Sequence, residues 1–430
     1  MNNHPQRYAL TNELHARPFP EVRAPSRAVF VAFMDEAGAE RDRDRDRAHL
    51  VDLLDRHGAV HPAPNASHYF GQLGRLRLKW EQHTEFVTYT LFADGVAETP
   101  FDGSTLKQFP AEWLAAAPGQ VITSALVRIE AAPTAEAAVA RLRDGLTHYF
   151  VNESLASSLV VDGGVLVASD FRIHEHDQVR FAVAALPEVG PRRLGRIVQR
   201  LLEVETYKTA AMLTLPIARE VAGRTNAMDR ELSALVQEMA DESGADRERL
   251  ARLLAMSAEI EALSAGSAFR FGAAGAYEAI VHQRIEVLRE ERVAGRQTFG
   301  EFMLRRFDPA MRTCRSAADR LHALAERTGR AADLLSTRVD VNLASQNRQL
   351  LESMNRRAAL QLRLQETVEG LSFVAISYYA VSLAAFLLAP ASALTGIAEV
   401  WLLAAVTVPV VLLVWLFVRR VRRRINRRQE

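Results

Sequence analysis

One short stretch of the sequence gathers side chains that could bind a metal ion. The segment DFRIHEHDQ contains Asp170, His174, His176 and Asp177. On a strand, His-x-His would direct both imidazoles to one face, and imidazole and carboxylate groups are common metal ligands. The same residue types are frequent in hairpin turns, and we favour a turn over a metal site.

Familiar catalytic and cofactor-binding motifs are missing from the chain. It contains no GxGxxG, GxxxxGK[ST], HExxH or GxSxG pattern. Cys314 is the only cysteine, so an internal disulfide or a cysteine zinc cluster is excluded. Its helical surroundings hold no nearby histidine, which argues against a nucleophile. We therefore predict that the protein is not an enzyme and uses no cofactor.

A proline-containing segment near the start carries Glu13, His15 and Arg17 in the sequence NELHARP. These groups could contact an anion or another ligand. Prolines at and after this segment disfavour both helix and sheet, so an extended arm packed along the domain is the interpretation we favour.

A second polar stretch, RLLEVETYKTA, begins at Arg200 and lies in a helical pattern. Glu203, Glu205, Tyr207 and Lys208 fall on more than one face of that helix. A helix in contact with two different neighbours would need such a mixture. An ion or effector site between those neighbours is the alternative.

Two long apolar runs, residues 371–389 and 397–418, dominate the C-terminal part of the chain. The first has no charged residue and the second has only Glu399. A helix rises about 1.5 Å per residue, so each run is long enough to cross a hydrocarbon core of about 30 Å. Backbone polar groups must be satisfied within such a segment, which leaves helix as the expected structure. The short connection predicts a two-helix transmembrane hairpin.

Basic residues directly after the second run set the expected orientation. We expect anionic lipid headgroups to contact Arg419, Arg420, Arg422, Arg423 and Arg424. Positively charged flanks remain cytoplasmic, and two crossings return the chain to the same side. Both termini are therefore predicted to be cytoplasmic, with the lipid bilayer as the first partner. The start of the chain shows no cleavable signal peptide.

Polar side chains within the first run form one candidate site. Ser372, Tyr379 and Ser382 fall within about 80° on a helical wheel, and Glu369 lies close to the same face. Polar groups in a crossing rarely face lipid. They are expected to join the two crossings, join neighbouring subunits or line a pore; helix–helix contact is the interpretation we favour over a pore.

The long region before the membrane divides in two. Strand patterns mixed with a few helices predict a mixed α/β domain over residues 1–190, including the N-terminal arm. Helical patterns rich in Arg, Glu, Leu and Ala then predict a long antiparallel bundle and coiled-coil stalk over residues 191–370. The transmembrane hairpin, 371–418, and a basic tail, 419–430, complete an α+β membrane protein. The net charge of +1 is too small to indicate binding to nucleic acid, so no nucleic-acid partner is expected.

Three separated motifs resemble one bacterial family. They are NELHARPFP, RLLEVETYKTAAMLTLPIAR and MNRRAALQLRLQETVEGLSFVAISYYAVSL. The chain is identified by them as similar to the membrane-anchored proteins of domain of unknown function 3422. The resemblance implies a location in the bacterial inner membrane and no particular activity.

The predicted layout also resembles the CorA divalent-cation channels. Those proteins are homopentamers with a cytoplasmic α/β domain, a stalk helix continuous with the first crossing, and a second crossing. The resemblance implies a homo-oligomer, a pentamer by analogy, that conducts cations through a ring of first crossings. The Gly-Met-Asn hallmark is absent and residues 390–396 carry no charge, so magnesium is not the expected ion. A non-transporting membrane-tethered scaffold or sensor is the alternative.

Overall fold

The computed structural model describes residues 3–13, 19–35, 41–64, 66–239, 245–293, 295–395 and 399–426. The chain divides into two compact units, Met1–Asp333 and Leu334–Glu430. The first unit holds a β-sheet and most of the helices, and the second holds the C-terminal apolar helices. The predicted combination of an N-terminal sheet domain, a long helix and an apolar C-terminal helix is confirmed.

Within the described residues, nine strands form one sheet in the order β2-β3-β4-β1-β5-β8-β7-β6-β9. Neighbouring strands run antiparallel except β5 and β8, which are parallel. The strands are β1 (Ser26–Met34), β2 (His68–Leu73), β3 (Leu76–Gln82), β4 (Phe86–Asp94), β5 (Gln120–Ala131), β6 (Ala156–Val160), β7 (Val165–Ser169), β8 (Val179–Ala185) and β9 (Glu291–Arg292). Because β9 pairs with β6, the sheet includes a strand from the segment predicted to be purely helical.

Both faces of the sheet are covered, which explains why β1 is apolar along almost its whole length. Alternate side chains of a strand point to opposite faces. Phe30 and Ala32 accordingly belong to one buried cluster, whereas Val29 and Val31 belong to another. The sheet is therefore the middle layer of the first unit.

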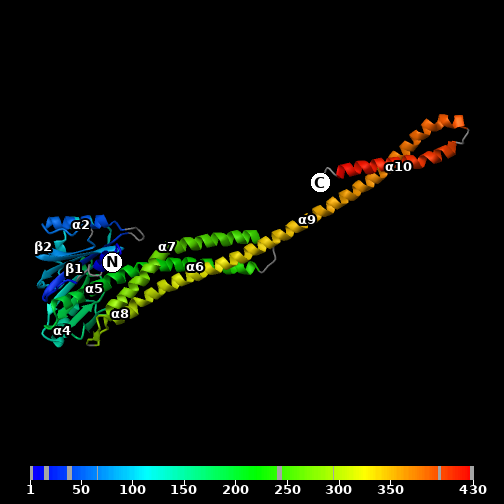
Figure 1. Cartoon of the computed structure of the whole chain (residues 1–430). Coiled ribbons are helices and arrows are strands. Elements are labelled where there is room, and N and C mark those ends of the chain that lie inside the picture. The colour runs from blue at the N-terminus through cyan, green and yellow to red at the C-terminus, as the bar shows by residue number, and fades with distance from the viewer. Residues whose placement is uncertain are drawn as a thin grey trace. The chain divides into compact units, whose positions relative to one another are not determined.

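Short helices and one long helix cover these two faces (Figure 1). The face of Val29 and Val31 packs against α2 (Arg43–Arg56), α3 (Ala111–Ala115) and α4 (Ala135–Arg141). The opposite face packs against α5 (Pro191–Met212). A proline at the first position of α5 suits a helix start, since its missing N–H would have no partner there.

Three long helices of the first unit form a bundle. They are α6 (Thr214–Glu238), α7 (Asp246–Glu286) and the beginning of α9 (Asp308–Thr395); the short α8 (Phe299–Arg306) precedes α9. Buried apolar residues at helical spacing line the bundle, including Leu232, Ile260 and Leu324. Exposed ion pairs join α6 to α7 through Arg224 and Glu259, 2.7 Å apart.

The alternation of apolar and polar residues over 73–80 predicts a single strand, and this prediction is wrong. The chain turns at Gly74, whose φ is +61°. Glycine adopts this left-handed conformation without steric cost. The turn creates β2, which the alternation pattern did not reveal, and β2 pairs with β3 as a hairpin.

The chain ahead of β1 begins with α1 (Arg7–Glu13) and continues, from Phe19, as an extended segment along α5. The Val22 amide donates to the Pro191 carbonyl at 3.1 Å, and Val22 is fully buried. A Cβ on Gly195 would lie 1.7 Å from the Pro20 carbonyl oxygen, so this approach requires glycine. The predicted extended, packed arm is confirmed for Phe19 onward, but it is wrong for Asn12 and Glu13, which end helix α1. His15 and Arg17 lie outside the described residues, as does the side chain of Glu13.

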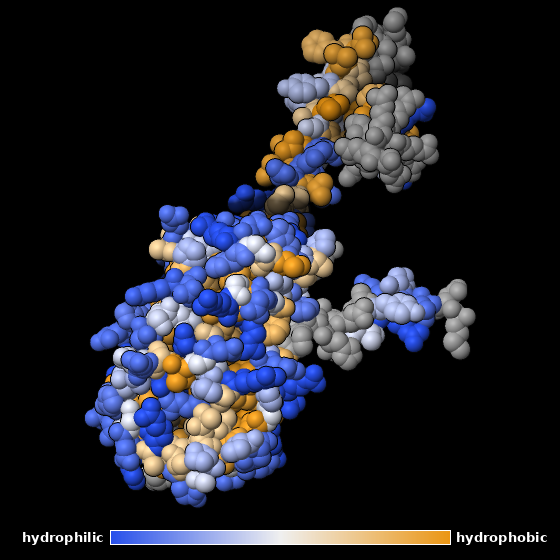
Figure 2. Space-filling model, turned by 90° about the vertical axis from the view of Figure 1, so that its left-hand side faces the viewer, coloured by the Kyte–Doolittle hydropathy of each residue, from blue (hydrophilic) through white to orange (hydrophobic). Residues whose placement is uncertain are grey.

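The second unit contains two helices long and apolar enough to cross a membrane, judged by length and composition. One is the C-terminal part of α9, and the other is α10 (Glu399–Asn426). Orange apolar residues gather on this part of the chain in Figure 2, whereas the sheet-bearing unit shows a mostly blue surface.

Candidate functional site

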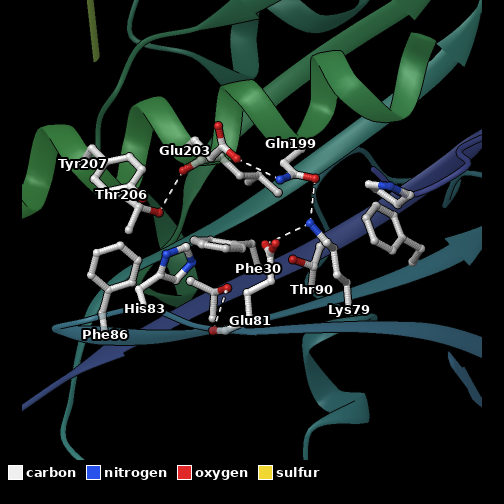
Figure 3. Close-up of a pocket in the computed structure, with 14 residues that line it drawn as sticks. Phe30, Lys79, Glu81, His83, Phe86, Thr90, Gln199, Glu203, Thr206 and Tyr207 are labelled. Atoms are coloured by element: carbon white, nitrogen blue, oxygen red, sulfur yellow. Dashed lines mark hydrogen bonds and ion pairs between the residues drawn. The ribbon is translucent and has the colours of Figure 1, made fainter. Parts of the chain in front are cut away.

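A connected cluster of buried polar groups lies between the sheet and α5. A cavity of about 20 Å³ is enclosed there by β1, β3 and β4 on one side and by α5 on the other. Its lining comprises Pro20, Phe30, Lys79, Glu81, His83, Phe86, Thr88, Thr90, Phe92, Gln199, Leu202, Glu203, Thr206 and Tyr207. Figure 3 shows the side chains of the two elements pointing toward one another.

Strand alternation explains why polar groups point into this layer. In β3, Leu78 and Trp80 join the apolar cluster on the α2 side of the sheet. Lys79 and Glu81 alternate with them and therefore face α5, although they are only 5% and 8% exposed. One face of the same strands is thus aromatic and aliphatic, and the other is charged.

We define the polar layer as Lys79, Glu81, Gln199, Glu203 and Arg284. Lys79 Nζ donates to Gln199 Oε1 at 2.6 Å and lies 2.9 Å from Glu81 Oε2. Gln199 Nε2 donates to Glu203 Oε1 at 2.8 Å. Arg284 of α7 pairs with the other oxygen of Glu203. The polar layer is therefore one connected chain of donors and acceptors from β3 through α5 to α7.

The size of the cavity limits its chemistry. A cavity of about 20 Å³ has room for roughly one water molecule, whereas small-molecule sites usually occupy several hundred Å³. Its charged groups already satisfy one another. The arrangement couples the sheet to the helices and, as it stands, leaves no room for a substrate.

A second buried polar contact joins the β3–β4 turn to α7. Arg270 and Tyr277 each donate to one carboxylate oxygen of Glu85. Burial raises the pKa of Tyr277 to about 12, partly opposed by the positive charge of Arg270. Burial also lowers the pKa of Arg270. The Tyr277 phenol therefore remains a protonated donor at neutral pH. The guanidinium of an arginine is protonated there in any case.

The predicted mixed face of α5 serves several neighbours, as expected. Glu205 is 2% exposed and accepts from Lys208 Nζ at 2.9 and 3.0 Å and from Thr123 of β5 at 3.3 Å. Tyr207 packs edge-on to Phe86, with ring centroids 5.5 Å apart, and beside Tyr277 at 5.3 Å. These contacts occupy the groups that could otherwise have held an ion or effector.

The histidine-rich stretch is a turn and not a strand. Ile173 pairs with Val179, and His176 adopts a φ of 64° within a short 3-10 turn. Buried Asp170 accepts from His174 Nε2 at 2.8 Å, whereas His176 lies against Gly103. Among the described residues, no three His, Cys, Asp or Glu side chains are grouped to hold a metal ion. Asp170 also accepts the Val151 amide at 2.7 Å, so its carboxylate anchors the loop.

Cys314 is 3% exposed and belongs to the buried cluster beneath α5. Burial raises the pKa of its thiol. A buried, protonated thiol is a poor nucleophile.

In the second unit, the polar side chains of the first apolar run face two directions. Ser377 is 7% exposed, and Phe373, Ala380 and Ala384 on the same face are half-buried. Tyr379 is 72% exposed, and Ser372 is also exposed; Ser382 is half-buried. Figure 1 draws α10 beside the C-terminal part of α9 within the second unit.

Glu369, predicted on the pore or helix-packing face, and the arginines predicted to contact lipid headgroups lie at the ends of the apolar helices. Glu369 accepts from Gln365 Nε2 at 3.3 Å on the exposed part of α9. The Arg419 guanidinium lies 4.7 Å from the Trp415 ring centroid, and Arg420 is exposed. The side chains of Arg422, Arg423 and Arg424 lie outside the described residues.

Of the polar layer, only Glu203 was singled out from the sequence, and the Glu85 contact was not predicted. A usable signal was present in β3, where LRLKWEQ places charged residues at every second position within a strand otherwise rich in apolar residues. The helix partners Gln199, Arg270 and Arg284 carry no comparable local signal, because only the tertiary fold brings them to the sheet.

Comparison with known proteins agrees with the sequence motifs. A search of curated proteins found no match to this chain. The model of the family described as "Protein of unknown function (DUF3422)" matches residues 2–425, which is nearly the whole chain. The chain therefore belongs to the DUF3422 family.

Proposed function

We propose that the protein is a homo-oligomeric component of the bacterial inner membrane that conducts cations through a ring of first crossings. Residues 371–389 and 397–418 are the two crossings, and the sheet-bearing unit is cytoplasmic. The arginines from Arg419 onward lie at the cytoplasmic surface. The analogy with CorA concerns this layout and not the ion selected.

The observation that carries the proposal is the orientation of the hydroxyl groups in α9. Ser377 is covered, whereas Ser372 and Tyr379 are exposed on another face of the same helix. Polar groups within a crossing avoid lipid. Their exposure therefore favours contact with neighbouring subunits or with a water-filled path, where hydroxyl oxygens can replace part of the hydration of a cation.

Cation flux into liposomes that contain the purified full-length protein tests the proposal. We expect flux that falls several-fold in Tyr379→Phe, because this variant keeps the ring and removes the hydroxyl. Val374→Ala, a change elsewhere on the helix, is the matched control and is expected to retain flux. Protein-containing liposomes no more permeable than empty ones to potassium, sodium, magnesium and cobalt would refute conduction.

The second candidate, a membrane-tethered scaffold or sensor, draws support from the polar layer. This chain of charged contacts links β3 to α5 and α7, so a partner that displaced one member would alter the others. Binding of a partner that requires residues 1–190, without ion flux, is the result this candidate predicts. An unchanged cellular phenotype after deletion of residues 1–190 would refute it.

A further inference from the structure

The part of α9 that leads into the first proposed crossing exposes apolar side chains in a regular pattern. Leu350, Met354, Leu364, Val368 and Leu371 are between 57% and 73% exposed. A large exposed apolar surface of this kind usually marks an interaction site. The second unit contains nothing among its described residues that covers these side chains.

The spacing of these residues is that of a coiled coil. Positions separated alternately by four and three residues form what we call the seam: Leu343, Asn347, Leu350, Met354, Arg357, Gln361, Leu364, Val368 and Leu371. At about 100° per residue, the seam covers an arc of about 120°. Such a repeat keeps one face of a helix directed toward a partner helix.

Charged side chains lie mainly on the opposite side. Arg348, Glu352, Arg356, Arg363 and Glu366 fall within an arc of about 80° centred opposite the seam. Within the seam itself, Arg357 is the one charged residue. The helix is therefore amphipathic, with its polar side suited to water and its apolar side lacking a partner.

The same side of α9 reverses its polarity where the proposed crossing begins. Ser372, Tyr379 and Ser382 continue within the arc of the seam, as the helix does not break between Asp308 and Thr395. Apolar groups are unfavourable in water, and hydroxyl groups are unfavourable in lipid. This side of α9 therefore exposes apolar groups where water would surround an isolated chain. Within the crossing, the same side exposes hydroxyl groups where lipid would surround it.

We infer that the seam is a parallel, in-register interface with a second copy of this chain. A partner must offer apolar groups opposite residues 343–371 and hydrogen-bonding groups opposite residues 372–382. A second α9 related by rotational symmetry offers both, since symmetry brings each residue near its own copy. Asn347 and Gln361 are polar seam positions, and such positions set register in coiled coils. The inference deepens the proposed function and rests on the crossing at residues 371–389.

Disulfide cross-linking of the full-length protein in membranes tests the interface. Single cysteines replace neighbouring leucines: Leu350→Cys against Leu351→Cys, and Leu364→Cys against Leu362→Cys. All four leucines are between 61% and 70% exposed, but only Leu350 and Leu364 lie in the seam. The unmodified chain, with buried Cys314, is the background control.

With a copper–phenanthroline oxidant, we expect several-fold more dimer from the two seam variants than from their partners. Equal cross-linking in both sets, or none in either, would overturn the inference. Flux without this pattern would leave conduction intact and remove the seam. The pattern without flux would retain the seam and remove conduction.

Discussion

Leu364 and Tyr379 lie on the same side of helix α9, about 60° apart around its axis, and their side chains are 70% and 72% exposed. Leu364 precedes the proposed crossing and Tyr379 lies within it. Each side chain is therefore unsuited to the medium that would surround an isolated chain. Burial of both against a symmetry-related helix removes this mismatch in one step.

Arg357 provides a test of the seam that does not require chemical modification. In a parallel assembly its guanidinium lies near its own copies, and like charges repel. We expect Arg357→Leu to strengthen self-association. Analytical ultracentrifugation of the full-length protein in detergent would then give a lower dissociation constant for the oligomer.

The adjacent Arg356→Leu is the control for Arg357→Leu. Arg356 falls on the charged side of α9, so the same change in composition leaves the seam untouched. Equal strengthening by both variants would point to general hydrophobicity instead of a defined interface.

The sequence was most informative where one periodicity extends over many residues. The helical spacing of α5 is such a pattern, and the unbroken apolar composition of β1 and of the two C-terminal runs is informative in the same way. Gly74 shows where such patterns fail. This single residue, in a left-handed conformation, ends β2 and starts the turn to β3, and the alternation of apolar and polar residues does not reveal the turn. Short strands with one exposed side give too few positions to distinguish a turn from a continued strand.

The candidate site shows a different limit. Lys79 and Gln199 are 120 residues apart in the chain, and their hydrogen bond exists only because α5 lies on the sheet. The polar character of one face of β3 could be predicted from the sequence, but the residues that contact this face could not. In contrast, the turn at His174 was correctly interpreted because Asp and His at such spacing favour local contacts.

The polar layer predicts a large effect from a single change. Lys79→Met leaves the Glu81 carboxylate buried without its cation, which typically costs about 3–5 kcal/mol. We expect a clear loss of unfolding free energy in urea titrations of the full-length protein, followed by tryptophan fluorescence.

Arg192→Met is the matched control for the buried pair. Arg192 and Glu21 form a pair 2.8 Å apart, but their side chains are 84% and 51% exposed. Exposed pairs contribute about 0–1 kcal/mol, so this variant is expected to remain close to the parent. Similar losses in both variants would show that burial of the Lys79 pair has no special role.

Stability is expected to depend on pH through His49. Its Nδ1 lies 2.9 Å from the Tyr89 hydroxyl and its Nε2 lies 2.9 Å from the Trp113 carbonyl oxygen, so Nε2 carries the proton. Burial lowers the pKa of His49 from its usual 6.5. The unfolded chain therefore binds a proton as pH falls through about 6.5, whereas the folded chain does not, and stability falls below that pH.

Comparison of His49→Gln with the parent isolates this contribution. The urea midpoint of the parent is expected to fall more steeply between pH 7 and 5.5 than that of His49→Gln. His322→Gln removes an exposed histidine and is expected to retain the parental slope. Parallel pH profiles for parent and His49→Gln would contradict the assignment.

The close contact between Gly195 of α5 and the N-terminal segment predicts the effect of adding a side chain at this position. A Cβ there would overlap the Pro20 carbonyl oxygen, so Gly195→Ala must displace the segment that contains Val22. We expect faster amide hydrogen exchange at Val22, whose amide bonds to Pro191. Gly190→Ala, where the added Cβ meets no atom within 4 Å, is the control. Unchanged exchange in Gly195→Ala would show that the segment does not depend on this contact.

Subunit number tests the central claim most directly. Native mass spectrometry of the full-length protein, released from detergent micelles, measures it without labels. The seam predicts one closed oligomer, five subunits by the CorA analogy, that becomes monomeric in Leu350→Glu but not in Leu351→Glu. A parent protein that is monomeric at every concentration would contradict both the shared interface and the conduction path built on it.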